Sequence, residues 1–205
     1  REYYAAAEKD LHESLALDPS NFRTYERLGN MHLQFDDDDK AEEFFKKGAA
    51  LNPFHNASYR LLAGIYVRRG RYAEAETLCR RSLELNPRIA SNYLMLARIY
   101  EALGERKKSD EMIRKALKTG SGKADIFSEA ASIYYDAKKD HARAVDLLKK
   151  DIRENPKHGL AYRMLGKIWI EQGQTDAARK MLEKSLALTP QNEQTLMDME
   201  DFWAR

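Results

Sequence analysis

The spacing of the prolines constrains this chain more than any other feature of its sequence. Successive prolines are separated by 34, 34, 69 and 34 residues, and 69 is the sum of 34 and 35. They are Pro19, Pro53, Pro87, Pro156 and Pro190. A regular period of this length predicts repeated units, each too small to bury an apolar face without its neighbours.

The same period brings further residues into register and predicts a first helix in each unit. Each unit has an aromatic residue, then Leu or Ala three residues later, then a Gly or Ala. The aromatic positions are Tyr25, Tyr59, Tyr93, Phe127 and Tyr162, and the small positions are Gly29, Ala63, Ala97, Ala131 and Gly166. Further apolar residues follow at spacings that place side chains on one face of a helix.

A second helix is predicted between a short break and the proline. In three units the break carries Gly70, Gly104 or Gly173, and glycine favours the left-handed conformation that ends many helices. The second helix has a small residue at Ala41, Ala75, Ser109, Ala144 or Ala178, and a larger one four residues later at Phe45, Cys79, Ile113, Leu148 or Leu182. Small residues on both helices let the two backbones approach closely.

This pattern resembles the tetratricopeptide repeat (TPR), a 34-residue helix–turn–helix unit. The resemblance covers nearly the whole chain and implies an all-α fold, a right-handed α-solenoid superhelix of antiparallel helix pairs. We expect a single domain over residues 1–205. It would comprise a half repeat at 1–20, full repeats at 21–54, 55–88, 89–122, 123–157 and 158–191, and a C-terminal capping helix at 192–205. The small positions on both helices favour this family over pentatricopeptide and half-tetratricopeptide repeats.

Two units depart from the pattern. The fourth ends in Gly120-Ser121-Gly122 instead of a proline. The fifth has one extra residue near 135–141, and Asp151 stands where a small residue is usual. We expect a looser turn after the fourth unit.

The chain neither starts nor stops on a repeat boundary. Residues 4–17 predict a second helix without its first, so we expect the natural protein to extend further at the N-terminus, or this half repeat to support self-association. In the last helix the inward positions hold Leu196, Met199, Phe202 and Trp203. The small position holds Glu200, which predicts a solvated, capping helix.

Composition excludes several classes of protein. The 35 Lys and Arg against 33 Asp and Glu give a net charge of +2, which argues against a dedicated nucleic-acid binder. No run approaches the roughly 18 apolar residues of a membrane-spanning helix. The single cysteine, Cys79, excludes an intramolecular disulfide and a multi-cysteine metal site. It favours the cytoplasm without fixing the compartment.

No catalytic or cofactor motif is complete. The five histidines are dispersed, and His32 takes an aromatic packing position. Cys79 takes an apolar packing position, which predicts a buried, inert thiol. The segment 120–123 resembles the end of a phosphate-binding loop, but Leu117 replaces the first glycine and Ala124 follows the lysine. The acidic run 36–39 is expected to face the positive N-terminal end of a second helix. The alternating ligand spacing of a calcium-binding loop is missing, which argues against calcium binding. We therefore expect no enzyme, no cofactor and no metal.

The resemblance implies that first helices line a concave groove. The residues predicted to line the peptide-binding part of this groove are Arg23, Arg27, Asn30, Arg60, Gly64, Arg68, Leu94, Met95 and Arg98. Arginine suits carboxylates, and the missing side chain at Gly64 predicts a recess for an apolar anchor. In the following unit Asp125, Glu129 and Asp136 predict an acidic stretch. The alternatives are that these charges only solvate an open face and that Gly64 is a tolerated helix glycine.

The predicted function is a protein–protein interaction scaffold that binds a peptide with an acidic and apolar motif. The alternative is a substrate-recruiting domain of a larger enzyme, such as a glycosyltransferase or protease, whose catalytic part lies outside this chain. A clamp for acidic chaperone tails is disfavoured because only Asn30 fits its pattern. No nucleic-acid partner and no membrane insertion are expected.

Overall fold

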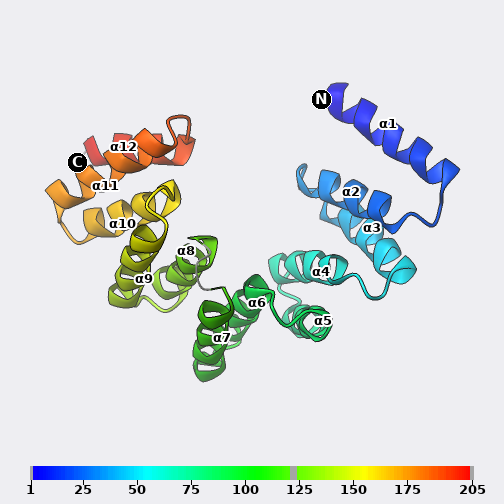
Figure 1. Ribbon diagram of the computed structural model, residues 1–205, viewed down its shortest axis with the longest axis horizontal. Helices are drawn as coiled ribbons and strands as arrows, with labels where there is room; N and C mark the ends of the chain where they lie inside the picture. The colour runs from blue at the N-terminus through cyan, green and yellow to red at the C-terminus, as the bar shows by residue number, and fades with distance from the viewer. Residues whose placement is uncertain (1, 121–123, 204–205) are drawn as a thin grey trace. The chain divides into compact units, whose positions relative to one another are not determined.

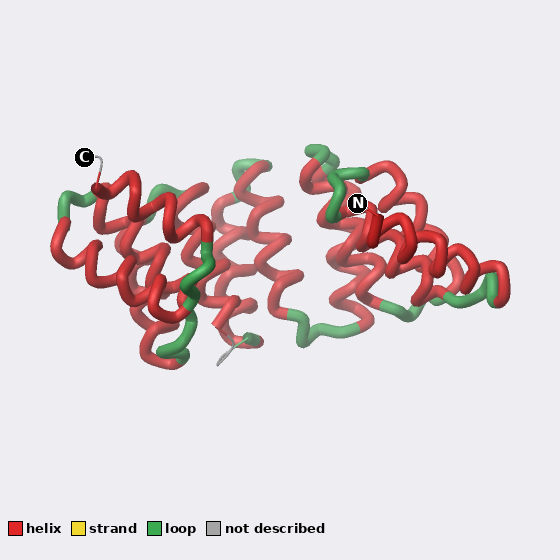
Figure 2. Tube along the Cα trace, turned by 90° about the horizontal axis from the view of Figure 1, so that it is seen from above, coloured by secondary structure: helices red, strands yellow, loops and turns green. Residues whose placement is uncertain are grey.

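The computed structural model of the chain describes residues 2–120 and 124–203. Within these residues every regular element is a helix and none is a strand, which confirms the predicted all-α class (Figure 2). The first helices are α2 (Phe22–Leu33), α4 (Asn56–Arg68), α6 (Ala90–Ala102), α8 (Ala124–Ser132) and α10 (Gly159–Glu171). The second helices are α3 (Asp38–Leu51), α5 (Tyr72–Leu85), α7 (Arg106–Thr119), α9 (His141–Glu154) and α11 (Thr175–Leu188), with α1 (Glu2–Leu17) and α12 (Glu193–Trp203) at the two ends.

The chain forms two compact units that divide within α6, one ending at Ile99 and the other beginning at Tyr100. In the first unit α2 lies beside α3 and α4 beside α5, and in the second α8 lies beside α9 and α10 beside α11 (Figure 1). Helices of successive pairs also pack together, as α3 does with α4 and α9 with α10. The grouping of all repeats into one domain, with the stated boundaries, stays a prediction.

Two helix pairs show the predicted contact between a small residue and a large one directly. A Cβ added to Gly29 would lie 2.5 Å from Cε1 of Phe45, and one added to Gly166 would lie 2.9 Å from Cδ2 of Leu182. The other small first-helix positions and all five large second-helix positions are fully buried: Ala63, Ala97, Ala131, Phe45, Cys79, Ile113, Leu148 and Leu182. Such close contact makes the core sensitive to a single added methyl group.

The turn between the two helices of a pair is closed by one recurring backbone hydrogen bond. An amide donates to the carbonyl oxygen five residues earlier, as from Arg71 to Tyr66 at 2.8 Å, and the other such pairs are Asp37 with His32, Glu105 with Tyr100 and Gln174 with Trp169. The residue before each of these donors has a positive φ. Gly70, Gly104 and Gly173 take this place as predicted, and Asp36 takes it at φ 58°. Asparagine and aspartate are the side chains that tolerate this conformation best after glycine.

The extra residue of the fifth repeat is accommodated by η1 (Ile133–Ala137), a π-helix that follows α8. The turn-closing bond here runs from Asp140 to Tyr134 and spans six residues in place of five. The insertion places Lys138 in a nearly buried ion pair, with its Nζ 2.5 Å from Glu101 Oε1 and 3.0 Å from Asp110 Oδ1. Burial alone would lower the pKa of Lys138, but these two carboxylates outweigh it and raise the pKa.

The last helix differs from the prediction at two positions. Thr195 is buried, with its Oγ1 3.3 Å from Ser185 Oγ, and Glu200 is exposed as predicted. Leu196 and Trp203, however, are 41% and 62% exposed, so their inward placement was wrong. Self-association through α1 stays a prediction.

Substitution of Gly29 by Ala should destabilise the protein by about 1–3 kcal/mol, because the new methyl group overlaps the Phe45 ring. The matched control is Gly64→Ala on the equivalent helix of the next repeat. There a Cβ meets only Met95 Cε, at 4.0 Å, so alanine should stabilise the helix by up to about 1 kcal/mol. Thermal unfolding followed by circular dichroism measures both changes. Equal shifts in the same direction would contradict this account of the packing.

Candidate functional site

Most of the residues predicted to line the groove are exposed or half-buried on the first helices. On α2 the side chains of Arg23, Arg27 and Asn30 are exposed at spacings of four and three residues. These spacings place the three residues on one face of the helix. On α4 and α6 the corresponding residues Gly64 and Arg98 are half-buried and exposed, respectively.

One predicted groove position is buried inside the fold instead. Leu94, which was assigned to the groove, is fully buried and therefore cannot contact a peptide. Ser128 occupies the same position one repeat later and is also buried, donating a hydrogen bond to Asp151 at 2.7 Å. Arg163 at this position pairs with Asp198 of α12 at 3.1 Å. In these three repeats the column makes contacts within the fold, and the assignment of Leu94 was wrong for that reason. Arg60, at the same position one repeat before Leu94, is half-buried.

The surface around Gly64 is open. Of all the atoms near a Cβ built on Gly64, only Met95 Cε comes within 4 Å. Leu61 and Val67 of α4 and Met95 of α6 are half-buried, so apolar surface borders this space. Arg60 lies one helical turn before Gly64 and is half-buried. We call this arrangement of Arg60, Leu61, Gly64, Val67 and Met95 the Gly64 recess.

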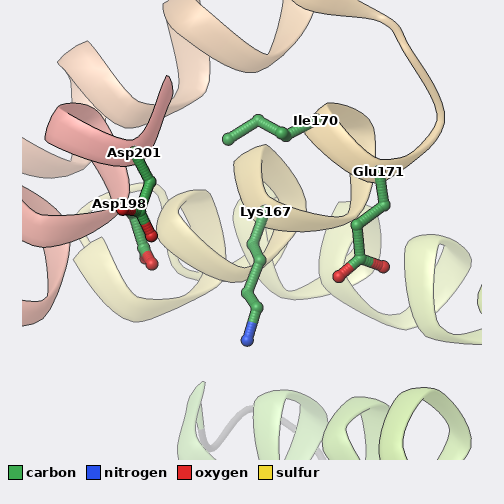
Figure 3. Close-up of a pocket in the computed structure, with 5 residues that line it drawn as sticks. All are labelled: Lys167, Ile170, Glu171, Asp198 and Asp201. Carbon is green, nitrogen blue, oxygen red and sulfur yellow. The ribbon is translucent and has the colours of Figure 1, made fainter. Parts of the chain in front are cut away.

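The second unit has a small pocket between α10 and α12. It is lined by Lys167, Ile170, Glu171, Asp198 and Asp201, and has a volume of about 60 Å³ (Figure 3). Asp198 and Asp201 belong to α12, the helix that was predicted to cap the chain. Their proximity to α10 could not be recognised without the contact between α12 and α10.

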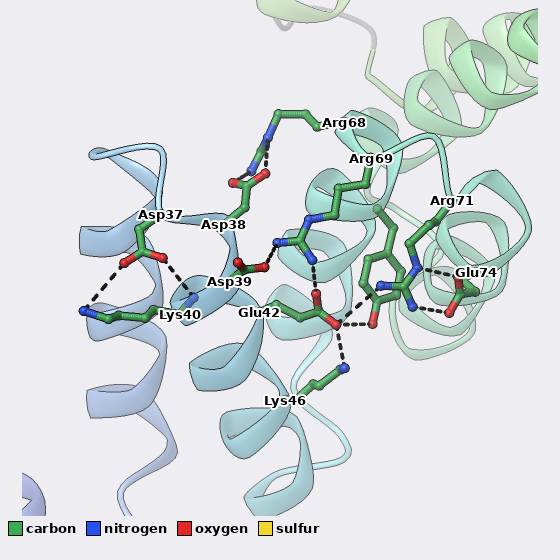
Figure 4. A network of polar contacts seen from close by, with 11 residues as sticks. Asp37, Asp38, Asp39, Lys40, Glu42, Lys46, Arg68, Arg69, Arg71 and Glu74 are labelled. Carbon is green, nitrogen blue, oxygen red and sulfur yellow. Dashed lines mark hydrogen bonds and ion pairs between the residues drawn. The ribbon is translucent and has the colours of Figure 1, made fainter.

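The acidic run at residues 36–39 is used within the fold (Figure 4). Asp37 caps α3 by accepting a hydrogen bond from the Lys40 amide at 3.2 Å, as the predicted placement at a helix N-terminus implies. Asp38 accepts two hydrogen bonds from Arg68, one of them from Nε at 3.2 Å. The guanidinium of Arg68 is therefore already engaged, which weakens its predicted role in binding a partner.

Glu42 is the centre of the same network. Its carboxylate accepts hydrogen bonds from Tyr66 Oη at 2.9 Å and from Arg69 Nη1 at 2.6 Å, and pairs with Lys46 at 2.5 Å (Figure 4). Burial works to raise the pKa of Glu42, but the hydrogen bonds from Lys46 and Tyr66 and the charge of Arg69 outweigh it, so the pKa is lowered. Tyr66 lies in the last turn of α4 and Arg69 directly follows that helix, so this network fixes the C-terminal end of the helix that carries Gly64.

The other candidate groups have structural roles or no visible site. Cys79 is fully buried, as predicted, and burial raises the pKa of its thiol to about 12, which disfavours the reactive thiolate. His32 is buried and stacked on Phe44 with ring centroids 5.4 Å apart. The segment 121–123 lies outside the described residues. Among residues 2–120 and 124–203, no group of His, Cys, Asp or Glu side chains is placed to hold a metal ion.

A buried polar cluster in the second unit was missed. Asp151 is fully buried and accepts hydrogen bonds from Ser128 at 2.7 Å and from Asn155 at 3.0 Å. His158 Nδ1 lies 2.8 Å from the same carboxylate. The sequence signalled this cluster only by placing an acid in a small-residue position. Its members are satisfied by one another, which is the usual condition for burying polar groups.

Two family models match the chain. Residues 2–119 match the cilia and flagella-associated protein 70 middle TPR-like domain, which is more than half of the sequence. Residues 137–196 match a tetratricopeptide repeat model. No curated protein matches the sequence.

Solved structures show the same fold. A tetratricopeptide repeat protein from Parabacteroides merdae ATCC 43184 aligns over 100% of this chain and 79% of its own, with 17% identity and a TM-score of 0.80. TTC0263, a thermophilic TPR protein from Thermus thermophilus, aligns over 90% of this chain and 100% of its own, with 17% identity and a TM-score of 0.75. YrrB, described as a TPR protein with an unusual peptide-binding site, aligns over 93% of this chain and 97% of its own, with 16% identity and a TM-score of 0.55. The fold is a tetratricopeptide-repeat solenoid. In the described part of this chain, no helix is both long and apolar enough to cross a membrane.

Substitution of Glu42 by Gln should lower the free energy of unfolding at neutral pH by about 1–3 kcal/mol, because a buried charged acceptor is lost. The folded-state pKa of Glu42 is lowered from 4.5, so its stabilisation is complete above that value and is lost as the pH falls through the lowered pKa. The difference between the wild-type protein and the variant should therefore shrink in acid. Urea unfolding over a pH series measures it, with the exposed neighbour Glu43→Gln as control. A difference that is the same at neutral and acidic pH would contradict the prediction.

Proposed function

Because the chain belongs to the tetratricopeptide-repeat family, and over residues 2–119 to that of the cilia and flagella-associated protein 70 middle TPR-like domain, we propose that it captures a peptide segment of a protein partner on its first helices. The general role of a protein–protein interaction scaffold follows from the family, since tetratricopeptide repeats are generally non-catalytic interaction modules. The existence of a peptide-binding site on the TPR protein YrrB supports peptide capture by this fold.

The observation that carries the proposal is the open position at Gly64. Two other helix glycines, Gly29 and Gly166, are packed so tightly that a methyl group would overlap a neighbour. Gly64 has no such neighbour, and so the packing of the fold does not require a glycine there. A glycine in a helix interior costs up to about 1 kcal/mol relative to alanine. We infer that Gly64 leaves room for a side chain of the partner.

The surrounding residues define the chemistry that this site favours. Arg27 and Arg60 form no ion pair within residues 2–120 and 124–203, so their guanidinium groups are available to carboxylates. Leu61, Val67 and Met95 are half-buried and offer apolar surface. A peptide that carries an acidic residue beside an apolar anchor would match both the arginines and the apolar surface.

A rigid scaffold lowers the cost of such binding. The Glu42 network holds the C-terminal end of α4 through Tyr66 and Arg69, which follow the helix turn that contains Gly64. A surface fixed before binding loses less conformational entropy when it binds. Affinity would then be concentrated in the anchor at the Gly64 recess, with the arginines setting specificity.

Selection from a random peptide library displayed on phage, using the whole chain as bait, tests the proposal. We expect enrichment of peptides with an acidic residue next to a large apolar one. Gly64→Leu should fill the recess and Arg60→Glu should repel the acidic residue, each weakening the selected peptides at least about tenfold. Neither change should lower the melting temperature, because Gly64 is open and Arg60 forms no ion pair in the described residues.

The matched control is Arg88→Glu, which reverses the charge of an exposed arginine in the loop after α5. It should leave the affinity for the selected peptides within about twofold. Selection of peptides without an acidic residue, or equal affinity of the wild type and both recess variants, would refute the proposed site. Enrichment of no peptide at all would refute peptide capture by this chain.

A further inference from the structure

We propose that the pocket between α10 and α12 is a second docking site, which takes an arginine side chain of a polypeptide partner. This site lies in the second unit and has the opposite chemistry to the Gly64 recess. The inference does not rest on the proposed function, because its residues, its ligand chemistry and its test are separate.

The residues that line the pocket carry an excess of negative charge. Glu171, Asp198 and Asp201 contribute three carboxylates, and Lys167 contributes one ammonium group (Figure 3). Asp198 is paired with Arg163 at 3.1 Å. Asp201 is exposed and forms no ion pair or hydrogen bond within residues 2–120 and 124–203. An acceptor therefore remains available at the edge of the pocket.

The contacts of Lys167 leave part of the negative charge of the pocket unneutralised. Lys167 Nζ lies 5.7 Å from the centroid of the Tyr135 ring, a cation–π contact. Tyr135 in turn donates a hydrogen bond from its hydroxyl to Glu171. Burial and the Glu171 carboxylate raise the pKa of Tyr135, so the phenol stays protonated and keeps donating at neutral pH. Lys167 is directed to Tyr135, and Glu171 keeps its second oxygen for a ligand.

Tyr135 lies in the stretch where the fifth repeat departs from a regular α-helix. Tyr135 belongs to η1, in which the Lys138 amide donates to the Ile133 carbonyl five residues earlier at 3.1 Å. The π-helix is anchored by the buried ion pair of Lys138 with Glu101 and Asp110. A single-turn π-helix is often found at a functional site. Here it supplies the ring that positions Lys167.

The size of the pocket and its neighbours select the ligand. A volume of about 60 Å³ is far below the roughly 300–1,000 Å³ of small-molecule sites, so the pocket holds the end of a side chain. Ile170 gives it an apolar wall, and Leu160 and Met164 lie earlier on α10, with Leu160 40% exposed. The planar guanidinium of arginine can bridge two carboxylates while its methylene stem covers apolar surface.

The carboxylates do not form a metal site, because no metal-holding group of acidic and histidine side chains occurs in the described part of the chain. Charge complementarity therefore favours an organic cation on a peptide. The exposed acids Asp125 and Asp136 on the preceding repeat extend the acidic character of the same unit. A basic peptide with an apolar residue beside its arginine would match this surface.

The test uses two pools of synthetic heptapeptides with a central Arg or a central Glu, in which uncharged residues vary at the other positions. Each pool is titrated into the isotopically labelled whole chain, and amide chemical shifts are followed by NMR. The Arg pool should shift the amides of Lys167, Ile170, Glu171 and Asp201, and the Glu pool should not. Raising the salt concentration should weaken binding, because exposed charges are screened.

The decisive variant is Glu171→Gln combined with Asp201→Asn, which keeps the shape of both side chains and an acceptor for Tyr135. It should weaken binding of the Arg pool roughly threefold to tenfold. Asp146→Asn on α9, an acid outside the pocket, should leave binding unchanged. Equal shifts with both pools, no shift with the Arg pool, or unchanged affinity of the double variant would each overturn the proposal. A loss of affinity with both the double variant and the Asp146→Asn control would also overturn it, because that would show only a general effect of charge.

Discussion

The whole structure depends on one repeated contact, in which a residue with little or no side chain on a first helix meets a large apolar side chain on the second. At Gly29 the Phe45 ring occupies the space where a Cβ would be, and Leu182 does the same at Gly166. This contact sets how closely the two helices of a pair approach. It also limits which faces remain for other purposes, because the side chains that form the contact are fully buried.

The contacts that follow the repeat period could be predicted from the sequence, and the contacts particular to one repeat could not. The small and large packing positions were correct because they recur in every unit. Leu94 was misplaced because its side chain is buried in the fold, although Arg60 at the same position one repeat earlier is only half-buried. Arg68 was predicted to be available to a partner, but Asp38, thirty residues earlier, already binds it. The cluster around Asp151 combines residues from two repeats and breaks the periodic pattern.

Departures from the period coincide with the chemistry that we assign to the second unit. In the repeat with one extra residue, the first helix ends in the π-helix η1. Lys138 directly follows η1 and is held by its buried ion pairs with two carboxylates. Tyr135 of η1 contacts both Glu171 and Lys167. In the first unit, where the period is regular, the distinguishing feature is a glycine that packing does not need. Each candidate site thus lies beside a feature that the core packing does not require: the π-helix η1 in one unit and Gly64 in the other.

The central claim is that the first helices recognise a partner while the second helices serve the scaffold. The most direct measurement is the set of amide chemical shifts of the whole labelled chain as a selected acidic, apolar peptide is added. The account predicts that the largest changes fall on exposed and half-buried residues of α2, α4 and the part of α6 that precedes Ile99. Changes concentrated on the outward residues of α3 and α5, with α2 and α4 unaffected, would contradict it.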